Sequence, residues 1–208
     1  TPSISSAASD VYKRQGNNSG HVRVFQYQVI SGTATWTQLG GDFDGVAAVD
    51  ISGVRRSLSS DGSRVAIGAA LNDGNGNNSG HVRIYQYNNN SWSQLGADID
   101  GEAAGDQSGS SVSLSSDGSR VVIGANNNDG GGTNSGHVRI YDYNGSAWVQ
   151  VGADIDGEGA GDASGFSVSI SSDGKRVAIG AEDNDAGNAY TDNRGHVRIY
   201  DYNGSAWV

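Results

Sequence analysis

The sequence contains no cysteine, no methionine and a single proline among 208 residues. The lack of cysteine excludes a disulfide framework and any chemistry that needs a thiol, although it leaves the cellular compartment open. Long apolar runs are also missing, since no stretch approaches the roughly 18 residues that a membrane-spanning helix requires. We therefore expect no membrane span in this sequence.

Positive charge is scarce as well. The chain has 13 Lys and Arg against 23 Asp and Glu, which gives a formal net charge of −10, and the acidic residues are spread through polar segments. A nucleic-acid surface needs clustered basic side chains to neutralise phosphates, and the sequence has no such cluster. The composition thus excludes nucleic acid as a partner and is compatible with the attraction of cations.

Hydrophobic residues make up only 35% of the chain and 33 residues are glycine, a composition that would indicate disorder if it lacked periodicity. Periodicity is present, however. Val112 and Leu114 alternate with serines at the strand period of two, and a β-branched run begins at Val121. Between them stands Asp117-Gly118, which predicts a hairpin closed by a two-residue type I′ turn.

This hairpin recurs at a fixed spacing, because its turn aspartates Asp61, Asp117 and Asp173 are 56 residues apart. Two further segments recur with it: one begins with Gly-His-Val-Arg, at residues 20, 80, 136 and 195, and the other contains Trp36, Trp92, Trp148 or Trp207. Four short strands per repeat are typical of a propeller blade. The sequence therefore predicts an all-β fold, a partial β-propeller of four-stranded antiparallel blades with about 56–60 residues per repeat. Within each blade, we expect the Gly-His-Val-Arg strand to pair antiparallel between the hairpin and the tryptophan strand.

The repeats also divide the chain. Residues 1–15 match no repeat and resemble, over residues 6–15, the translation of a sequencing-library adaptor, so we expect a disordered leader that is not native to the protein. The sequence does not begin with methionine and stops within a repeat, which predicts a fragment assembled from environmental reads with both true termini missing. The partial propeller covers residues 16–208, with blade 1 (partial) at 16–46, blade 2 at 47–102, blade 3 at 103–158 and blade 4 (partial) at 159–208.

All four histidines occupy the same place in the repeat, directly before Val-Arg. An active site needs one constellation rather than four copies, so we expect these histidines and arginines to pack and hydrogen-bond between blades. The tryptophans are expected to anchor the outer strands. The alternative is that exposed tryptophans on one rim stack on sugar rings.

One loop of each repeat is rich in carboxylates and reads Asp-Ile-Asp-Gly-Glu in blades 2 and 3, with another Asp four residues after the Glu. Carboxylates at alternate positions, with glycine to turn the backbone, offer the oxygen ligands that Ca²⁺ requires, although the third Asp or Asn and the distal Glu of an EF-hand loop are missing. The alternative is a solvated Asp-Gly turn. If the chain binds calcium, the sequence predicts these metal ligands: Asp98, Asp100, Glu102, Asp154, Asp156 and Glu158.

The repeat resembles the FG-GAP repeat of integrin-α-type β-propellers, in which Phe-Gly and Gly-Ala-Pro bracket the first hairpin of a blade. The segments that carry the resemblance are Ser-Gly-Phe166-Ser, Arg-Val-Ala-Ile-Gly180-Ala181 and Gly-His-Val-Arg-Ile-Tyr. The calcium loop of that family, an Asp-rich turn between the first two strands, is replaced here by Ser-Ser-Asp-Gly. The turn around Asp173 is also similar to the Ser-Pro-Asp-Gly-Lys turn of bacterial WD40-like propellers.

The resemblance implies a non-enzymatic extracellular or cell-surface module for adhesion or ligand recognition, whose ligand is a protein or a carbohydrate. No catalytic residue and no cofactor other than calcium is predicted, because no unique His, Asp or Glu breaks the symmetry of the repeats. The alternative is that the chain is the scaffold portion of a propeller enzyme that acts on polysaccharide, with its catalytic residues in other blades.

Overall fold

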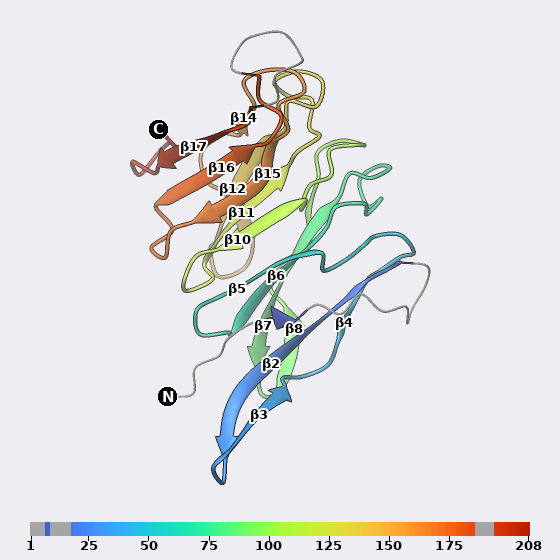
Figure 1. Cartoon of the computed structure of the whole chain (residues 1–208), viewed down its shortest axis with the longest axis vertical. Helices are drawn as coiled ribbons and strands as arrows, with labels where there is room; N and C mark the ends of the chain where they lie inside the picture. The colour runs from blue at the N-terminus through green and yellow to red at the C-terminus, as the bar shows by residue number, and fades with distance from the viewer. Residues whose placement is uncertain (1–6, 9–17, 186–193) are drawn as a thin grey trace.

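The computed structural model describes residues 7, 8, 18–185 and 194–208, and within these ranges the chain forms β-strands joined by turns and loops (Figure 1). This part of the chain contains no helix that could cross a membrane. Of the expected leader, Ala7 and Ala8 are described as a short strand paired with Val24 and Arg23, and the rest lies outside the described residues.

The strands form four antiparallel sheets that follow one another along the chain. The first contains β1 (Ala7–Ala8), β2 (His21–Ile30), β3 (Thr33–Gln38) and β4 (Phe43–Asp44). The second contains β5 (Arg55–Leu58), β6 (Arg64–Ala69), β7 (His81–Asn88), β8 (Ser91–Gln94) and β9 (Ile99–Asp100). The third contains β10 (Ser111–Leu114), β11 (Arg120–Ala125), β12 (His137–Tyr143), β13 (Trp148–Gln150) and β14 (Ile155–Asp156), and the fourth contains β15 (Ser164–Ile170), β16 (Arg176–Ala181) and β17 (His196–Asp201).

The second sheet shows the order of strands within a blade, which is β5-β6-β7-β8. The Gly-His-Val-Arg strand β7 lies between the hairpin and the tryptophan strand, and Trp92 is paired with Tyr87. This order confirms the prediction. The outer strand continues as β9, which pairs with the first residues of β7, where His81 lies opposite Asp100. The acidic loop predicted to bind calcium is therefore partly a strand.

The hairpin turns differ from the predicted type. In blade 3 the backbone N–H of Ser115 donates to the carbonyl of Arg120 at 2.9 Å, so four residues, not two, close the loop. Of these, Gly118 alone has a positive φ, of 66°, whereas a type I′ turn needs two. The carboxylate of Asp117 accepts hydrogen bonds from Ser115 Oγ (2.7 Å) and Ser119 N (3.0 Å). The type I′ prediction was wrong because the flanking serines let the aspartate cap a longer loop.

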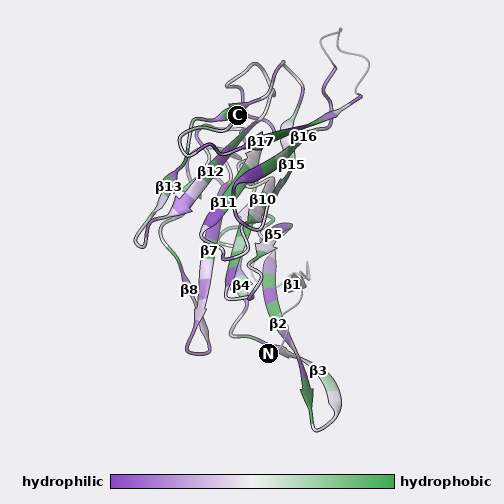
Figure 2. Cartoon of the chain, turned by 90° about the vertical axis from the view of Figure 1, so that its left-hand side faces the viewer, coloured by the Kyte–Doolittle hydropathy of each residue, from purple (hydrophilic) through white to green (hydrophobic). Residues whose placement is uncertain are grey.

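Hydrophobic side chains pack between blades. Along β6, Val65 and Ile67 face blade 1, whereas Ala66 between them faces blade 3. The same alternation occurs along β11, where Val122 is turned toward blade 4. Successive strand residues point to opposite faces of a sheet, so a run such as Arg-Val-Ala-Ile can serve two interfaces at once. Bands of hydrophobic and hydrophilic residues alternate along β2 in Figure 2.

Three of the four tryptophans tie an outer strand to the preceding blade. The indole Nε1 donates to a main-chain carbonyl in these pairs: Trp92 to Leu39 at 2.7 Å, Trp148 to Leu95 at 2.7 Å, and Trp207 to Val151 at 2.9 Å. The residue after each acceptor is a glycine. At Gly96, where φ is 79°, an added Cβ would lie only 2.9 Å from Cδ1 of Trp148. These hydrogen bonds confirm the prediction that the tryptophans anchor the outer strands, for Trp92, Trp148 and Trp207.

The innermost strands β5, β10 and β15 lie next to one another, as the strands around a propeller axis do. Their hairpin turns are linked by main-chain hydrogen bonds, because Ser60 N donates to Ser116 O (2.8 Å) and Ser116 N donates to Ser172 O (3.1 Å). Ser57 Oγ also accepts from Leu114 N at 2.9 Å. Small serines on the inner strands therefore bring neighbouring blades into direct backbone contact.

Candidate functional site

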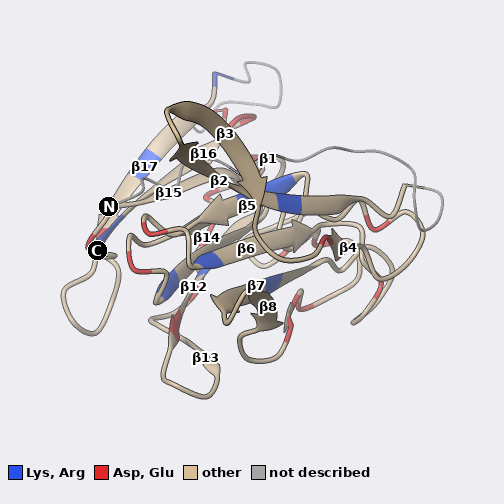
Figure 3. Cartoon of the chain, turned by 90° about the horizontal axis from the view of Figure 1, so that it is seen from below, with Lys and Arg blue, Asp and Glu red and all other residues tan. Residues whose placement is uncertain are grey.

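Polar side chains gather at the two ends of the strands. We call the end with the hairpin turns, residues 59–63, 115–119 and 171–175, the turn face. The other end, here the loop face, carries the loops 70–80 and 126–136 and the acidic loops 98–106 and 154–162. Figure 3 shows many of the acidic residues in loops and turns, with Lys and Arg placed largely on strands.

Buried Asp–Asn pairs hold the loop face together. Asp106 Oδ2 accepts hydrogen bonds from Asn128 Nδ2 (3.0 Å) and from Ala103 N (2.9 Å), and both side-chain partners are buried. The same pair recurs as Asp50 with Asn72 and as Asp162 with Asn184. Each pair fixes an acidic loop onto the long loop that follows it, so these carboxylates act as internal ties.

The structure distributes the carboxylates of the acidic loops among different partners. In blade 2, Asp98 Oδ2 accepts from Nε and Nη2 of Arg83, at 2.9 and 2.7 Å, and Asp98 Oδ1 accepts from Gln94 Nε2 at 2.6 Å. Burial by itself would raise the pKa of Asp98, but these hydrogen bonds outweigh it and lower the pKa below 3.8. Asp98 therefore neutralises Arg83 within its own blade.

The remaining predicted ligands do not complete a calcium loop. Asp100 and Asp156 are exposed, while Glu102 and Glu158 each turn to the following blade. Glu102 Oε1 lies 3.5 Å from Arg139 Nη1, and Glu158 Oε1 lies 3.8 Å from Arg198 Nη1. Among the described residues, no three carboxylates of one acidic loop come within 4.8 Å of one another. Calcium binding stays a prediction, without the geometry that the sequence suggested for it.

A histidine joins carboxylates of two blades instead. His137 Nδ1 lies 3.8 Å from Glu102 Oε2 and 3.8 Å from Asp154 Oδ2, and all three atoms lie within 4.8 Å of one another. The His137 side chain is 2% exposed. Burial, followed by the nearby charge of Arg139, lowers the pKa of His137 below 6.5, so the imidazole is neutral at pH 7. Sequence reasoning had given this histidine a purely structural role.

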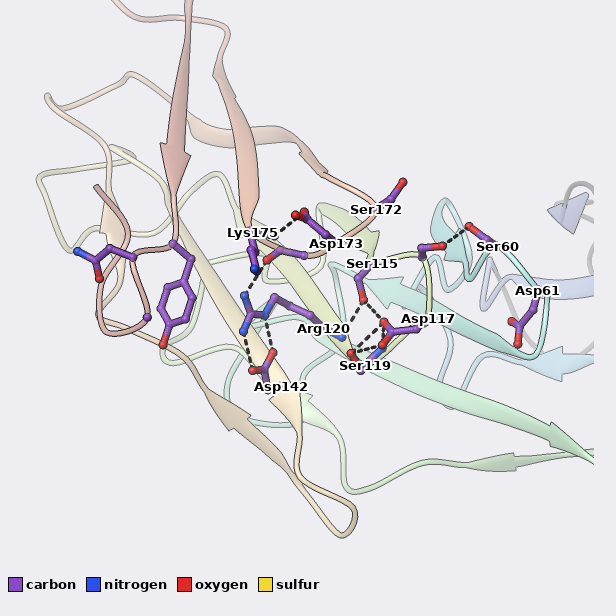
Figure 4. Close-up of a pocket in the computed structure, with 15 residues that line it drawn as sticks. Ser60, Asp61, Ser115, Asp117, Ser119, Arg120, Asp142, Ser172, Asp173 and Lys175 are labelled. Atoms are coloured by element: carbon purple, nitrogen blue, oxygen red, sulfur yellow. Dashed lines mark hydrogen bonds and ion pairs between the residues drawn. The ribbon is translucent and has the colours of Figure 1, made fainter.

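The turn face carries a cavity of about 740 Å³. Figure 4 shows the three successive turns side by side along it, with Asp61, Asp117 and Asp173 in a row. Its lining is rich in hydroxyl groups and also includes one aromatic ring, that of Tyr202. The serines of the lining are Ser60, Ser115, Ser116, Ser119 and Ser172.

Arg120 also lines this cavity. Its Nε and Nη2 donate to the two carboxylate oxygens of Asp142, at 2.5 and 2.7 Å, and its Nη1 donates to the carbonyl of Gly174 at 2.7 Å. The guanidinium carbon lies 4.9 Å from the centre of the Tyr202 ring, within the range of a cation–π interaction. The hydrogen bonds that Arg120 donates to Asp142 raise the pKa of Arg120 above its ordinary value. This residue is a fixed cation that holds blade 4 against blade 3.

Lys175 breaks the repeat symmetry in the cavity, because Ser63 and Ser119 occupy its position in blades 2 and 3. Its side chain is exposed and, in the described part of the chain, its ammonium forms no ion pair within 4.0 Å. The neighbouring Asp173 is fully exposed, and the Ser171 hydroxyl together with the main chain of Lys175 lowers the pKa of Asp173. The cavity therefore offers one exposed cation without an ion pair beside several carboxylates.

Successive antiparallel sheets that pack face to face, with their innermost strands next to one another, define a β-propeller repeat protein. Residues 97–141 match the model of the FG-GAP repeat. The chain is therefore a partial β-propeller, one segment of which matches the FG-GAP repeat, as the sequence resemblance indicated. A search of curated proteins gave no match.

Solved structures resemble the fold. One is the crystal structure of a candidate 6-phosphogluconolactonase from Bacteroides uniformis, with a TM-score of 0.57 and 14% sequence identity. The similarity covers 98% of this chain and 52% of that protein, so the chain spans about half its length. At this identity, the likeness shows the propeller fold and nothing about activity.

Proposed function

We propose that this chain belongs to a non-enzymatic interaction module that binds its ligand in the cavity on the turn face. The observation that carries the proposal is the lining itself, in which three repeats contribute hydroxyl groups and carboxylates and one of them adds the exposed Lys175. Convergent polar groups of this kind orient a ligand and provide specificity. An extracellular or cell-surface location is part of the proposal and rests on the resemblance to FG-GAP propellers.

The carboxylates of the cavity suit binding better than acid catalysis. A general acid needs a pKa raised toward neutrality. Burial would raise the pKa of Asp117, but hydrogen bonds from the main chain and side chain of Ser119 and from Ser115 lower it instead. The pKa of Asp61 is lowered in the same way, by hydrogen bonds from Ser63 and Ser59. Both carboxylates are therefore ionised acceptors with fixed positions.

The chemistry of the lining favours a carbohydrate over an anionic ligand. Four aspartates against one arginine and one lysine leave the cavity with a negative formal charge, which repels phosphate or sulfate. Sugar hydroxyls can donate to carboxylates and accept from serine hydroxyls and from an ammonium group. The half-buried ring of Tyr202 adds an apolar surface beside these groups. A protein ligand with a polar loop is the other outcome of the test below.

The test is a glycan array followed by calorimetric titration of the best glycan. We expect Lys175→Ser, which restores the residue of the other repeats, and Ser172→Trp, which obstructs the cavity, to weaken binding about tenfold or more. Ser93→Trp, at an exposed position of the outer strand β8, is the matched control and should bind as the unmodified protein does. If neither cavity variant weakens glycan binding, the site is refuted. If the protein captures other proteins but no glycan, the protein ligand is favoured. Release of new reducing ends from a polysaccharide would overturn the non-enzymatic reading.

A further inference from the structure

We propose that Glu102, His137 and Asp154 form a binding site for a divalent transition metal of the zinc type, which bridges blades 2 and 3 on the loop face. The site is independent of the turn-face cavity, since it lies at the opposite end of the strands. It differs from the predicted calcium loops because it takes carboxylates from two acidic loops and adds an imidazole nitrogen.

The geometry of the three ligand atoms is close to that of a zinc site. Zinc in proteins is bound by His nitrogen and carboxylate oxygen at roughly 2.0–2.2 Å, which in a tetrahedron places ligand atoms about 3.4 Å apart. His137 Nδ1 lies 3.8 Å from both Glu102 Oε2 and Asp154 Oδ2. The carboxylate side chains are 46% and 31% exposed, so a small movement of each would close the remaining gap. Three protein ligands leave a fourth position for water.

Each carboxylate already has a partner that orients it and leaves the ligand oxygen open. Arg139 Nη1 lies 3.5 Å from Glu102 Oε1, and Gln150 Nε2 donates to Asp154 Oδ1 at 2.5 Å. The other oxygens, Oε2 and Oδ2, are the ones that face His137. Outer partners of this kind fix the direction of metal ligands in proteins. The His137 side chain is 2% exposed, so the imidazole that these two oxygens face is held in place by its surroundings.

The equivalent positions in blade 2 show why the set is special. His81 Nδ1 also lies 3.8 Å from Asp98 Oδ2, but that oxygen accepts two hydrogen bonds from Arg83 and is not open. The counterpart of Glu102 one repeat earlier is Val46, which offers no ligand atom. Because no glutamate draws Arg83 away, it stays on Asp98. His81, Asp98 and Asp100 also place three ligand atoms within 4.8 Å of one another, but there Arg83 occupies the Asp98 oxygen that faces the imidazole. The set in which both carboxylates keep an open oxygen toward the imidazole is therefore the one at His137.

The chemistry of the ligand atoms sets the kind of metal. Calcium takes six to eight oxygen ligands and does not favour imidazole, whereas imidazole with carboxylates suits zinc and its neighbours in the first transition row. The two carboxylates together with the guanidinium of Arg139 give one net negative formal charge beside His137. A divalent cation is thus attracted to the site rather than repelled.

Isothermal titration of the tag-free, chelator-treated protein with Zn²⁺ alone tests the proposal. We expect one binding event that Ca²⁺ does not reproduce, and a loss of affinity of about tenfold or more in both Glu102→Gln and His137→Gln. Glu102 is exposed, so its variant remains informative if His137→Gln fails to fold. The matched control is His81→Gln, which should bind Zn²⁺ as before. Absence of heat with folded protein, or binding that both ligand variants leave unchanged, would overturn the proposal.

Discussion

The indole of Trp148 donates a hydrogen bond of 2.7 Å to the carbonyl of Leu95, which lies 53 residues earlier in the neighbouring blade. This bond predicts how a ring that anchors two blades responds to substitution. Trp148→Phe keeps most of the packing but leaves the carbonyl unpaired, so we expect a loss of about 1 kcal/mol in the free energy of unfolding. Trp148→Ala also removes the ring from the hydrophobic cluster and should cost about 3–5 kcal/mol. Urea denaturation measures both values.

The control for this prediction is Trp36, the counterpart of Trp148 in blade 1. It is 48% exposed, and its indole has no carbonyl partner among the described residues. We expect Trp36→Phe to change stability by less than about 0.5 kcal/mol. An equal cost at both positions would show that the indole hydrogen bond contributes nothing.

A second prediction separates buried ties from surface carboxylates. Asp106→Ala leaves Asn128 Nδ2 and the Ala103 amide without their acceptor in a buried setting, and should cost about 2–3 kcal/mol. Asp100→Asn, at an exposed carboxylate six residues earlier, should be close to neutral. Thermal denaturation of both variants, with and without Ca²⁺, distinguishes this tie from a calcium ligand. A Tm of Asp106→Ala that matches the unmodified protein would contradict the assignment.

The pH dependence of stability provides a third prediction. Burial, followed by the charge of Arg83, lowers the pKa of His81 in the folded protein below 6.5. The unfolded chain therefore takes up a proton at a higher pH than the folded chain does. The stability due to this group is complete above pH 6.5 and is lost as the pH falls from 6.5 through the folded pKa, with a slope of at most about 1.4 kcal/mol per pH unit.

The measurement is urea denaturation between pH 7.5 and 5 in the presence of a chelator. We expect His81→Gln, which cannot be protonated, to show a shallower fall than the unmodified protein over this range. A variant whose stability falls as steeply as that of the unmodified protein would mean that another group carries the effect.

A fourth prediction builds on the proposed zinc site. Val46 is 59% exposed and occupies the place that Glu102 has in the next repeat. Val46→Glu should draw Arg83 away from Asp98. His81 would then face two open carboxylates, Glu at position 46 and Asp98, in the arrangement that Glu102 and Asp154 have around His137. We expect the number of bound Zn²⁺ ions per chain to rise from one to two in calorimetric titration. Val46→Gln is the matched control, and a stoichiometry of one in Val46→Glu would count against the ligand assignment.

Much of the fold could be predicted from the sequence, because the determinants of a blade lie within one repeat. The alternation around Val112 and Leu114 and the 56-residue spacing of the turn aspartates were enough to predict strands, blades and their order. The turn type could not be read from Asp-Gly alone. Side-chain hydrogen bonds from two serines decided it, and they compete with the backbone geometry that Asp-Gly favours.

The candidate site was harder to predict because its ligands come from different repeats. Glu102 and His137 are 35 residues apart and meet through blade packing, which no local pattern in the sequence reveals. Identical placement of the histidines in every repeat indicated a structural role for all of them. The available signal was the difference between Val46 and Glu102, a departure from the repeat next to a position that is otherwise constant.

The serine turns described above have a consequence for how such a chain can change in length. Ser116 accepts a main-chain hydrogen bond from Ser60 of the preceding blade and donates one to Ser172 of the following blade. One repeat therefore carries both the acceptor and the donor of the contact between neighbouring turns. Trp148 and Val151 play the same two roles for the outer strands. Each blade therefore fits a copy of itself, and gene duplication in units of 56 codons creates no new unmatched surface. Excision of residues 103–158 should leave Ser60 of blade 2 able to donate to Ser172 of blade 4, as it now donates to Ser116.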